Sequence, residues 1–125
     1  MKIALIHLAT RKTPEATLEK GLELLYQARQ EGATVAVLPE LFSSGYRYAD
    51  AAFTPTVLAR LQSFCADHSM TLVAGVLEPS GERYANRAKV IGPAGVQASY
   101  TKTHLIPAFG EPETMTPGQD LVTLG

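Results

Sequence analysis

Residues 2–39, KIALIHLATRKTPEATLEKGLELLYQARQEGATVAVLP, decide the fold class of this chain. The segment begins with an apolar run at 2–9 and ends with a partly β-branched run at 33–38, and each run predicts a buried strand. A helical pattern occupies the stretch between them. Strand, helix and strand within about 40 residues make a βαβ unit, so the two strands should lie parallel with a right-handed crossover. The segment therefore predicts an α/β fold.

The helix between these two strands has recognisable start and stop signals. Thr13 is a predicted N-cap, Pro14 is a predicted first helical residue, and Gly32 is the predicted stop. Leucines recur at helical spacing between these signals, at Leu18, Leu22 and Leu25.

The strand and helix signals then occur a second time. Thr54 and Pro55 again resemble an N-cap and a first helical residue, which predicts a helix over about residues 55–68. One face of that helix is apolar and consists of Val57, Leu58, Leu61, Phe64 and Cys65. A third buried strand is predicted over 71–77.

The remaining third of the chain predicts a hairpin followed by irregular structure. A fourth strand is expected over about 84–91 and a fifth over about 96–101, joined by the turn residues at 92–95. Three prolines and two glycines at 107–118 favour an ordered loop, and 121–124 predict the beginning of another strand. Together the elements predict a mixed sheet, folded as a single unit over the whole chain.

Composition and charge exclude several classes of protein. The 125 residues are 46% hydrophobic, enough for one core, and 11 basic residues nearly balance 12 acidic ones without runs of like charge. Neither nucleic acid nor an anionic membrane is therefore an expected partner. The amino terminus makes a poor secretory signal, and no stretch approaches the roughly 20 apolar residues of a membrane helix. A single cysteine excludes an internal disulfide, so we expect a soluble cytoplasmic protein.

Two charged residues follow predicted strands and are candidates for catalysis. Glu40 comes directly after the second strand, in VLPELFSSGY, and Lys102 ends the fifth, in YTKTHLIP. In open parallel sheets, ligands bind beyond the carboxyl ends of the strands. A carboxylate there can take a proton from a nucleophile, and an ammonium can stabilise an oxyanion. From position alone, however, a solvated loop glutamate and an exposed lysine are the commoner interpretations.

Several short motifs favour the catalytic interpretation of Glu40 and Lys102. Residues 39–42 (PELF) with Gly45-Tyr46 resemble the glutamate motif of the nitrilase superfamily of carbon–nitrogen hydrolases, and 100–105 (YTKTHL) resemble its lysine motif. Glu111 stands six residues before Pro117-Gly118, as does the auxiliary glutamate of many members. The resemblance covers essentially the whole chain.

The resemblance implies the amino-terminal portion of a four-layer αββα sandwich of roughly twice this length. The two helices would cover one face of one sheet. It also implies hydrolysis of a non-peptide carbon–nitrogen bond in a small amide, carbamoyl amine or nitrile, with amidase favoured weakly over nitrilase. In that mechanism a cysteine thiolate attacks the substrate carbon and water later releases the thioester.

The same resemblance assigns roles to residues of this chain. Glu40 would be the general base that activates the thiol and then water, and Lys102 would stabilise the tetrahedral intermediate. Glu111 would position substrate or order Lys102, with Glu113 as the less favoured occupant of that role. No cofactor is expected, and the three histidines are too dispersed to suggest a metal site.

Two further residues complete the predicted site, and the single cysteine is not one of them. Tyr46 and His104 belong to the two motifs and are expected to line or shape the substrate pocket. Cys65 shares a helical face with leucines, so it is expected to be a packed structural cysteine. In the family that the motifs resemble, the nucleophilic cysteine follows the lysine by some tens of residues, so it is expected beyond this chain, and the isolated chain is expected to be inactive.

A different class of function stays open at this stage. If no second sheet covered the helix-free face of the predicted sheet, that face would be an exposed apolar surface. The chain would then be a non-catalytic interaction module, and it would form a homo-oligomer or associate with the missing half.

Overall fold

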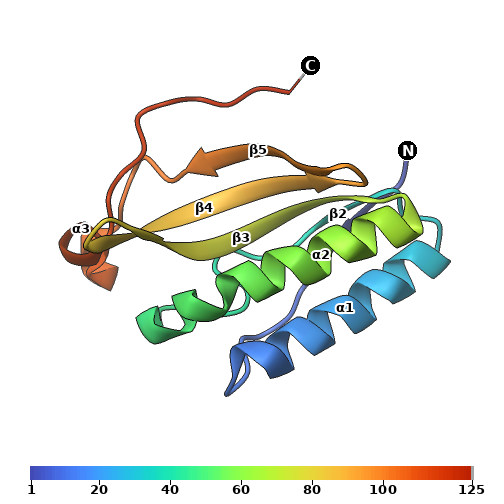
Figure 1. The fold of residues 1–125 in the computed structure, drawn as a ribbon, viewed down its shortest axis with the longest axis horizontal. Coiled ribbons are helices and arrows are strands. Elements are labelled where there is room, and N and C mark those ends of the chain that lie inside the picture. Colours follow the sequence, from blue (N-terminus) through green and yellow to red (C-terminus); the bar gives the residue numbers. More distant parts are fainter. Residues whose placement is uncertain (125) are drawn as a thin grey trace.

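A five-stranded mixed sheet with two long helices on one face forms the body of the molecule (Figure 1). The structure is a computed structural model and describes residues 1–124. The first three strands are parallel, and the last two add antiparallel, in the order β1-β2-β3-β4-β5. The strands are β1 (Ile3–Leu5), β2 (Val35–Val37), β3 (Thr71–Ser80), β4 (Arg83–Gly92) and β5 (Gly95–Thr101). The predicted mixed sheet is confirmed, although β1 and β2 are shorter than their apolar runs.

The two helices are α1 (Pro14–Gln30) and α2 (Thr54–His68), and they lie side by side against the same face of the sheet (Figure 1). The predicted cap of α1 is confirmed, because the Thr13 hydroxyl accepts a hydrogen bond from the Ala16 N–H at 3.2 Å. One helix layer and one sheet layer are thus present, as expected for part of an αββα sandwich.

The predicted cap of α2 is wrong. Thr54 is the first helical residue, and the N-cap position belongs to Phe53, the last residue of the 3-10 helix η1 (Tyr48–Phe53). The reason is that the Thr54 hydroxyl is buried and donates to the Leu77 carbonyl on β3 at 2.6 Å. That hydroxyl therefore fixes α2 to the sheet and does not bind the helix amino terminus.

The core lies between the helices and the sheet. Leu18 and Leu25 of α1 and Leu61 of α2 are buried against Leu72 of β3. Cys65 is fully buried there, and its thiol lies 3.4 Å from the Ile91 carbonyl oxygen. Burial raises the pKa of Cys65 to about 11, so the thiol stays protonated at neutral pH. These properties agree with the expected packed cysteine.

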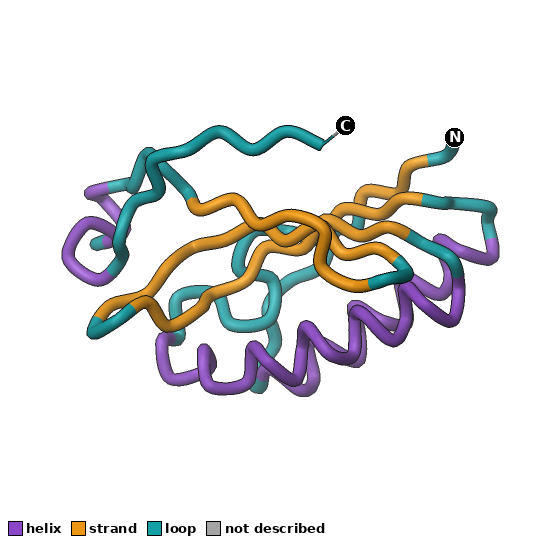
Figure 2. Tube along the Cα trace, turned by 45° about the horizontal axis from the view of Figure 1, so that its top comes forward, coloured by secondary structure: helices purple, strands orange, loops and turns teal. Residues whose placement is uncertain are grey.

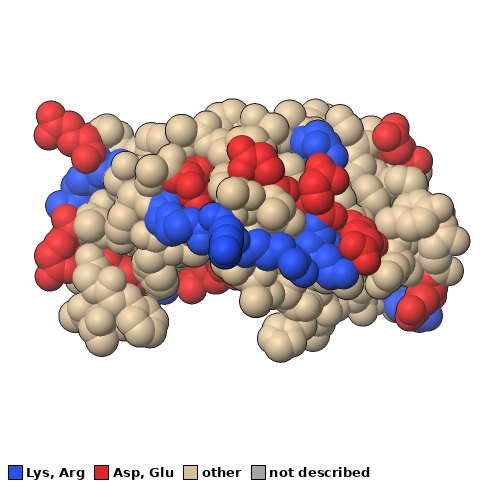
Figure 3. Space-filling model, turned by 90° about the horizontal axis from the view of Figure 1, so that it is seen from below, with Lys and Arg blue, Asp and Glu red and all other residues tan. Residues whose placement is uncertain are grey.

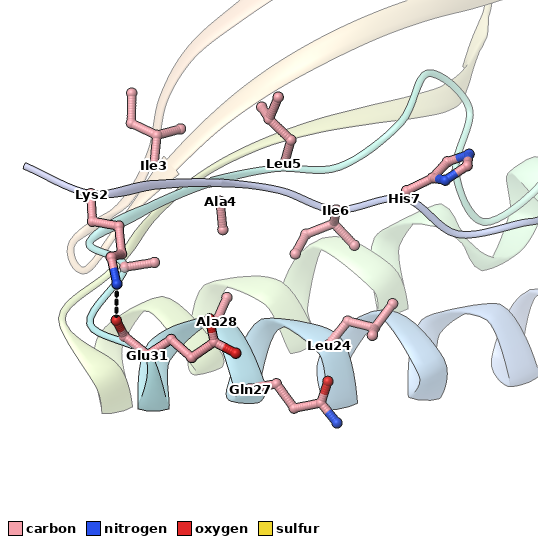
Figure 4. A pocket seen from close by; sticks show the side chains of 11 residues that line it. Lys2, Ile3, Ala4, Leu5, Ile6, His7, Leu24, Gln27, Ala28 and Glu31 are labelled. Carbon is pink, nitrogen blue, oxygen red and sulfur yellow. Dashed lines mark hydrogen bonds between the residues drawn. The ribbon is translucent and has the colours of Figure 1, made fainter.

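The face of the sheet opposite the helices is partly apolar and open. Along β1, Ala4 and Ile6 point toward α1, whereas Ile3 and Leu5 point away from it (Figure 4). Ile3 is 51% exposed and Leu5 is 80% exposed. Between this edge strand and α1 lies a hollow of about 410 Å³. The alternation of a half-buried strand is therefore retained on β1, with apolar side chains on both faces.

The chain after β5 differs from the predicted loop. Within 107–118 it forms the 3-10 helix η2 (Pro107–Phe109) and the short helix α3 (Glu111–Thr114), and Met115 then bridges to Tyr84. The Arg83 guanidinium donates to the carbonyls of Pro112 and Met115, which holds α3 beside the start of β4.

The strand predicted at 121–124 is not formed. After α3 the chain turns back and runs past the β5 edge without joining the sheet (Figures 1 and 2). Among residues 1–124, β5 is therefore the edge strand of the sheet, and residues 121–124 have no place in its ladder.

Charged side chains of both signs cover the helical side of the molecule. Viewed from below, a row of Lys and Arg side chains is bordered by Asp and Glu (Figure 3). Arg60 of α2 pairs with Glu19 of α1 at 2.9 Å, and Lys20 pairs with Glu23 at 2.9 Å. None of the helices in residues 1–124 has the length and apolar character needed to cross a membrane.

Candidate active site

The sheet topology brings Glu40 and Lys102 to the same edge. β2 and β3 are parallel, and two successive antiparallel pairings then return β5 to the direction of β2. Glu40 follows the carboxyl end of β2 and Lys102 follows the carboxyl end of β5, so both lie at one edge of the sheet. The Lys102 Nζ lies 3.0 Å from Glu40 Oε1. Residues 62 positions apart in sequence thus form one ion pair.

The backbone of Glu40 lies directly on β3, at a glycine. A Cβ atom on Gly75 would lie 2.6 Å from the Glu40 Cα and 2.6 Å from the Pro39 carbonyl oxygen. The Phe42 N–H also donates to the Gly75 carbonyl at 3.1 Å. Any larger residue at position 75 would displace the loop that carries Glu40.

The residue after Glu40 has a strained backbone. Leu41 has a φ of +48°, in the left-handed region, which costs an L-residue with a side chain about 1–2 kcal/mol. Its side chain is buried in a small cluster with Leu77 and Met115, and that packing offsets the strain. Such strain is characteristic of functional sites, where the surrounding structure fixes an unusual conformation.

The Lys102 ammonium bridges two carboxylates. Its Nζ lies 3.0 Å from Glu40 Oε1 and 3.2 Å from Glu111 Oε1. Burial acts to lower the pKa of Lys102, but the hydrogen bonds to Glu40 and Glu111 outweigh it and hold that pKa above its ordinary value. Lys102 is therefore a permanent cation at neutral pH.

Glu111 is buried completely and uses both of its carboxylate oxygens. Oε1 accepts from the Tyr46 hydroxyl at 2.8 Å as well as from Lys102, and Oε2 accepts from the Ile106 N–H at 2.7 Å. Burial acts to raise the pKa of Glu111, but the donors from Ile106, Tyr46 and Lys102 hold it below its usual range. Glu111 is thus an ionised carboxylate in a buried position.

The structure also shows which of the other candidate residues belong to this cluster. Glu111 binds Lys102, whereas Glu113 is exposed. The Tyr46 hydroxyl contacts Glu111, and burial together with that hydrogen bond raises the pKa of Tyr46. His104 is exposed and bonds the neighbouring Thr103 hydroxyl at 2.9 Å, outside the cluster.

One member of the cluster had no role in the sequence analysis. Asn86 on β4 is only 4% exposed, and its Nδ2 donates to Glu40 Oε1 at 2.8 Å. The available signal was an asparagine inside a predicted strand, because a polar side chain that a sheet buries needs a partner. Gly75 was also missed, and its only signal was a glycine inside an otherwise apolar strand.

A cavity opens beside this cluster. It has a volume of about 240 Å³, and its lining includes Glu40, Lys102, Asn86, Gly75, Val73 and Tyr100. Space for a small molecule thus adjoins a carboxylate and an ammonium. Residues 1–124 contain no group of three or more His, Cys, Asp or Glu side chains placed to hold a metal ion.

Comparison with protein families gives a match along nearly the whole chain. A family model described as carbon–nitrogen hydrolase matches residues 2–124. The chain belongs to the carbon–nitrogen hydrolase family. The resemblance to the nitrilase superfamily seen in the motifs is therefore confirmed.

The relatives of this chain include a nitrilase and several omega-amidases. The chain is 31% identical to a nitrilase of Pyrococcus abyssi over 74% of its own length and 38% of the relative's. It is 31% identical to omega-amidase NIT2 of Danio rerio over 96% of its own length and 48% of the relative's. The chain thus spans about half the length of the curated relatives it matches.

Solved structures agree on the fold. The NitN amidase from Neterenkonia sp. AN1 superposes with a TM-score of 0.82 at 28% identity, covering 94% of this chain and 49% of that one. A carbon–nitrogen hydrolase from Helicobacter pylori G27 gives a TM-score of 0.84 at 22% identity, which supports the fold alone. Another structure of the Nesterenkonia amidase is described as carrying acrylamide on an active site cysteine.

Proposed function

We propose that the protein is an amidase-type carbon–nitrogen hydrolase and that this chain supplies Glu40, Lys102 and Glu111 to its active site. The observation that supports this most directly is the Lys102 ammonium held 3.0 Å from Glu40 and 3.2 Å from Glu111 beside a cavity. A positioned base next to a fixed cation meets the requirements of acyl transfer, which needs proton abstraction and oxyanion stabilisation.

The proposed reaction proceeds through a covalent thioester. Glu40 takes the proton of a cysteine thiol, and the thiolate attacks the amide carbon to form a tetrahedral oxyanion near Lys102. The carbon–nitrogen bond then breaks, and Glu40 returns the proton to the departing ammonia or amine. Glu40 next takes a proton from water, and the water oxygen attacks the thioester carbon. The carbon–sulfur bond then breaks, the carboxylic acid leaves, and Glu40 returns the proton to the departing thiolate, which restores the thiol.

The nucleophile in this proposal is a cysteine outside these 125 residues. Cys65 is the single cysteine here, and it is buried in the core with a raised pKa, so it is unsuited to attack. The active site cysteine of the Nesterenkonia amidase supports the general scheme. The predicted inactivity of the isolated 125 residues follows from the missing nucleophile.

Amides are favoured over nitriles and carbamoyl amines as substrates. The omega-amidase NIT2 relatives align along 94% or more of this chain, whereas the nitrilase of Pyrococcus abyssi aligns along 74%. The proposed partners are therefore small amides. The cytoplasmic location and the homo-oligomer or association with a second half stay predictions.

Release of ammonia from a substrate panel tests the proposal. The protein encoded by the complete gene is incubated with short aliphatic amides, carbamoyl amines and nitriles, in parallel with residues 1–125 alone. The protein encoded by the complete gene should hydrolyse amides, and residues 1–125 alone should hydrolyse no compound of the panel. Turnover by residues 1–125 alone would contradict the missing-nucleophile argument, and hydrolysis of nitriles without amides would contradict the substrate assignment.

A second candidate function is a non-catalytic interaction module. The exposed apolar side chains of Ile3 and Leu5 on the helix-free face favour it. Native mass spectrometry of residues 1–125 distinguishes the two, because an interaction module should form a stable oligomer or complex. A persistent monomer that binds no partner would remove the basis for this candidate.

A further inference from the structure

We propose that Asn86 is a positioning residue that determines which oxygen of Glu40 is free to accept a proton. The inference rests on the proposed function of Glu40 as the general base. Asn86 Nδ2 lies 2.8 Å from Glu40 Oε1. Because a carboxylate oxygen only accepts hydrogen bonds, the amide must present its NH₂ group to Glu40, which fixes the orientation of the side chain.

Both donors to Glu40 bind the same oxygen. Lys102 Nζ also donates to Oε1, at 3.0 Å, whereas within residues 1–124 Oε2 has no hydrogen-bond donor. The Glu40 side chain is 53% exposed, so Oε2 is accessible from outside. Hydrogen bonds from two sides hold Oε1 in place, and rotation of the carboxylate would break both. Oε2 is therefore the oxygen that is available for proton transfer.

Asn86 holds the second catalytic candidate as well. Its backbone carbonyl accepts the Lys102 N–H at 2.9 Å, so the same residue of β4 fixes the start of the segment after β5. In the other direction, Asn86 pairs with Leu77 in the β3–β4 ladder. Its side chain is 4% exposed and cannot turn to solvent without disturbing the sheet. One residue in the centre of the hairpin thus aligns Glu40 through its side chain and Lys102 through its backbone.

The competing explanation is that Asn86 only fills space in the sheet, and two substitutions separate shape from hydrogen bonding. Asn86→Asp keeps the shape but replaces the donor with an acceptor that repels Glu40. Asn86→Leu keeps a similar volume and removes the donor. With the full-length protein and a short aliphatic amide, kcat should fall about 10–100-fold in N86L, because a misplaced catalytic group costs that much. It should fall further in N86D, while KM changes less than kcat in both variants.

Thr54→Val is the matched control. Thr54 is buried and its hydroxyl bonds a β3 carbonyl, but it lies outside the Glu40 cluster. T54V should lose stability and retain kcat within about twofold. If N86D and N86L retain kcat to the same degree as T54V, or if their KM rises while their kcat is unchanged, the positioning role is wrong.

A spectroscopic measurement tests the contact independently of catalysis. The ¹⁵N and ¹H resonances of the Asn86 side-chain amide should shift in Glu40→Gln and stay in place in Glu113→Gln. If the wild-type protein hydrolyses no amide, the proposed function fails, and the resonances still decide whether Asn86 holds Glu40. Unchanged Asn86 resonances in E40Q would overturn the inference even if the amidase activity is found.

Discussion

Glu40 and Glu111 bind the same ammonium from two different parts of the molecule, and their surroundings are opposite. Glu40 sits on the loop after β2, its side chain is 53% exposed, and both of its donors bind one oxygen. Glu111 sits in α3, is completely buried, and accepts from three donors through both oxygens. One carboxylate therefore keeps a free oxygen, and the other has none.

This difference indicates that the two carboxylates have different roles. A carboxylate whose pKa is held below its usual range by three donors stays ionised and exchanges no proton near neutral pH, so Glu111 serves as a fixed anchor for Lys102. Glu40 has an accessible oxygen next to the cavity and is able to receive and return a proton. Substitutions at the two positions should accordingly affect different quantities.

The largest effect is expected from Glu40→Gln. The amide cannot act as a base, so kcat of the full-length protein should fall about 10²–10⁴-fold. The free energy of unfolding should change by less than about 1 kcal/mol, because partly exposed ion pairs contribute little. Steady-state kinetics and urea unfolding measure both quantities. Glu113→Gln is the control, since Glu113 is an exposed glutamate of the same region, and equal activity loss in both variants would refute the assignment of Glu40.

Glu111→Leu should affect mainly the free energy of unfolding. Removal of this carboxylate leaves Tyr46 and Ile106 without their acceptor and leaves Lys102 with Glu40 alone, which should cost about 2–3 kcal/mol in the free energy of unfolding. Chemical denaturation of E111L and E113L measures the difference. A loss in E111L no larger than in E113L would show that the buried cluster does not stabilise the fold.

The sequence predicted Glu40 and Lys102 because their surroundings are local motifs at the ends of strands. The βαβ unit and the hairpin followed from hydrophobic periodicity and turn residues, and the direction of the strands placed both residues at one edge. Thr54 was misassigned because its partner, the Leu77 carbonyl, is distant in sequence. Asn86 was given no role for the same reason, since nothing near it in sequence shows that its amide meets Glu40.

The region from 107 to 118 was the least predictable part of the fold. Its prolines and glycines favour a loop, but Arg83 binds two of its carbonyls and stabilises α3. Glu111 was recognised from its motif, yet its complete burial depends on those long-range contacts. Local sequence therefore predicted the position of the exposed carboxylate after a strand, whereas the environment of the buried carboxylate required the tertiary structure.

An intermediate effect is expected from Gly75→Ala, which tests how firmly the exposed carboxylate is placed. The added Cβ would lie 2.6 Å from the Glu40 Cα, so the loop must move while Glu111 stays in position. A displacement of this kind should reduce kcat about 10–100-fold. Gly81→Ala is the control, because a Cβ on Gly81 would meet open space, although the φ of +61° at Gly81 favours glycine. G81A should lose about 1 kcal/mol of stability and keep its kcat.

The smallest effect is expected from Tyr46→Phe, and its dependence on pH distinguishes the role of Glu111 from that of Glu40. Tyr46→Phe removes one donor from Glu111 and none from Glu40, so it should lower the free energy of unfolding by about 1–2 kcal/mol at pH 7. The pKa of Glu111 is lowered in the folded state. The stability linked to its ionised form is therefore fully present above the ordinary glutamate pKa of about 4.3. This stability is lost as pH falls through the folded pKa. The deficit of Y46F should therefore be constant near neutral pH and shrink in acid, as both proteins lose the ionised carboxylate. Urea unfolding at a series of pH values measures it, and a deficit that stays the same down to pH 2 would mean that the Tyr46 hydroxyl stabilises the fold by a route other than the Glu111 carboxylate.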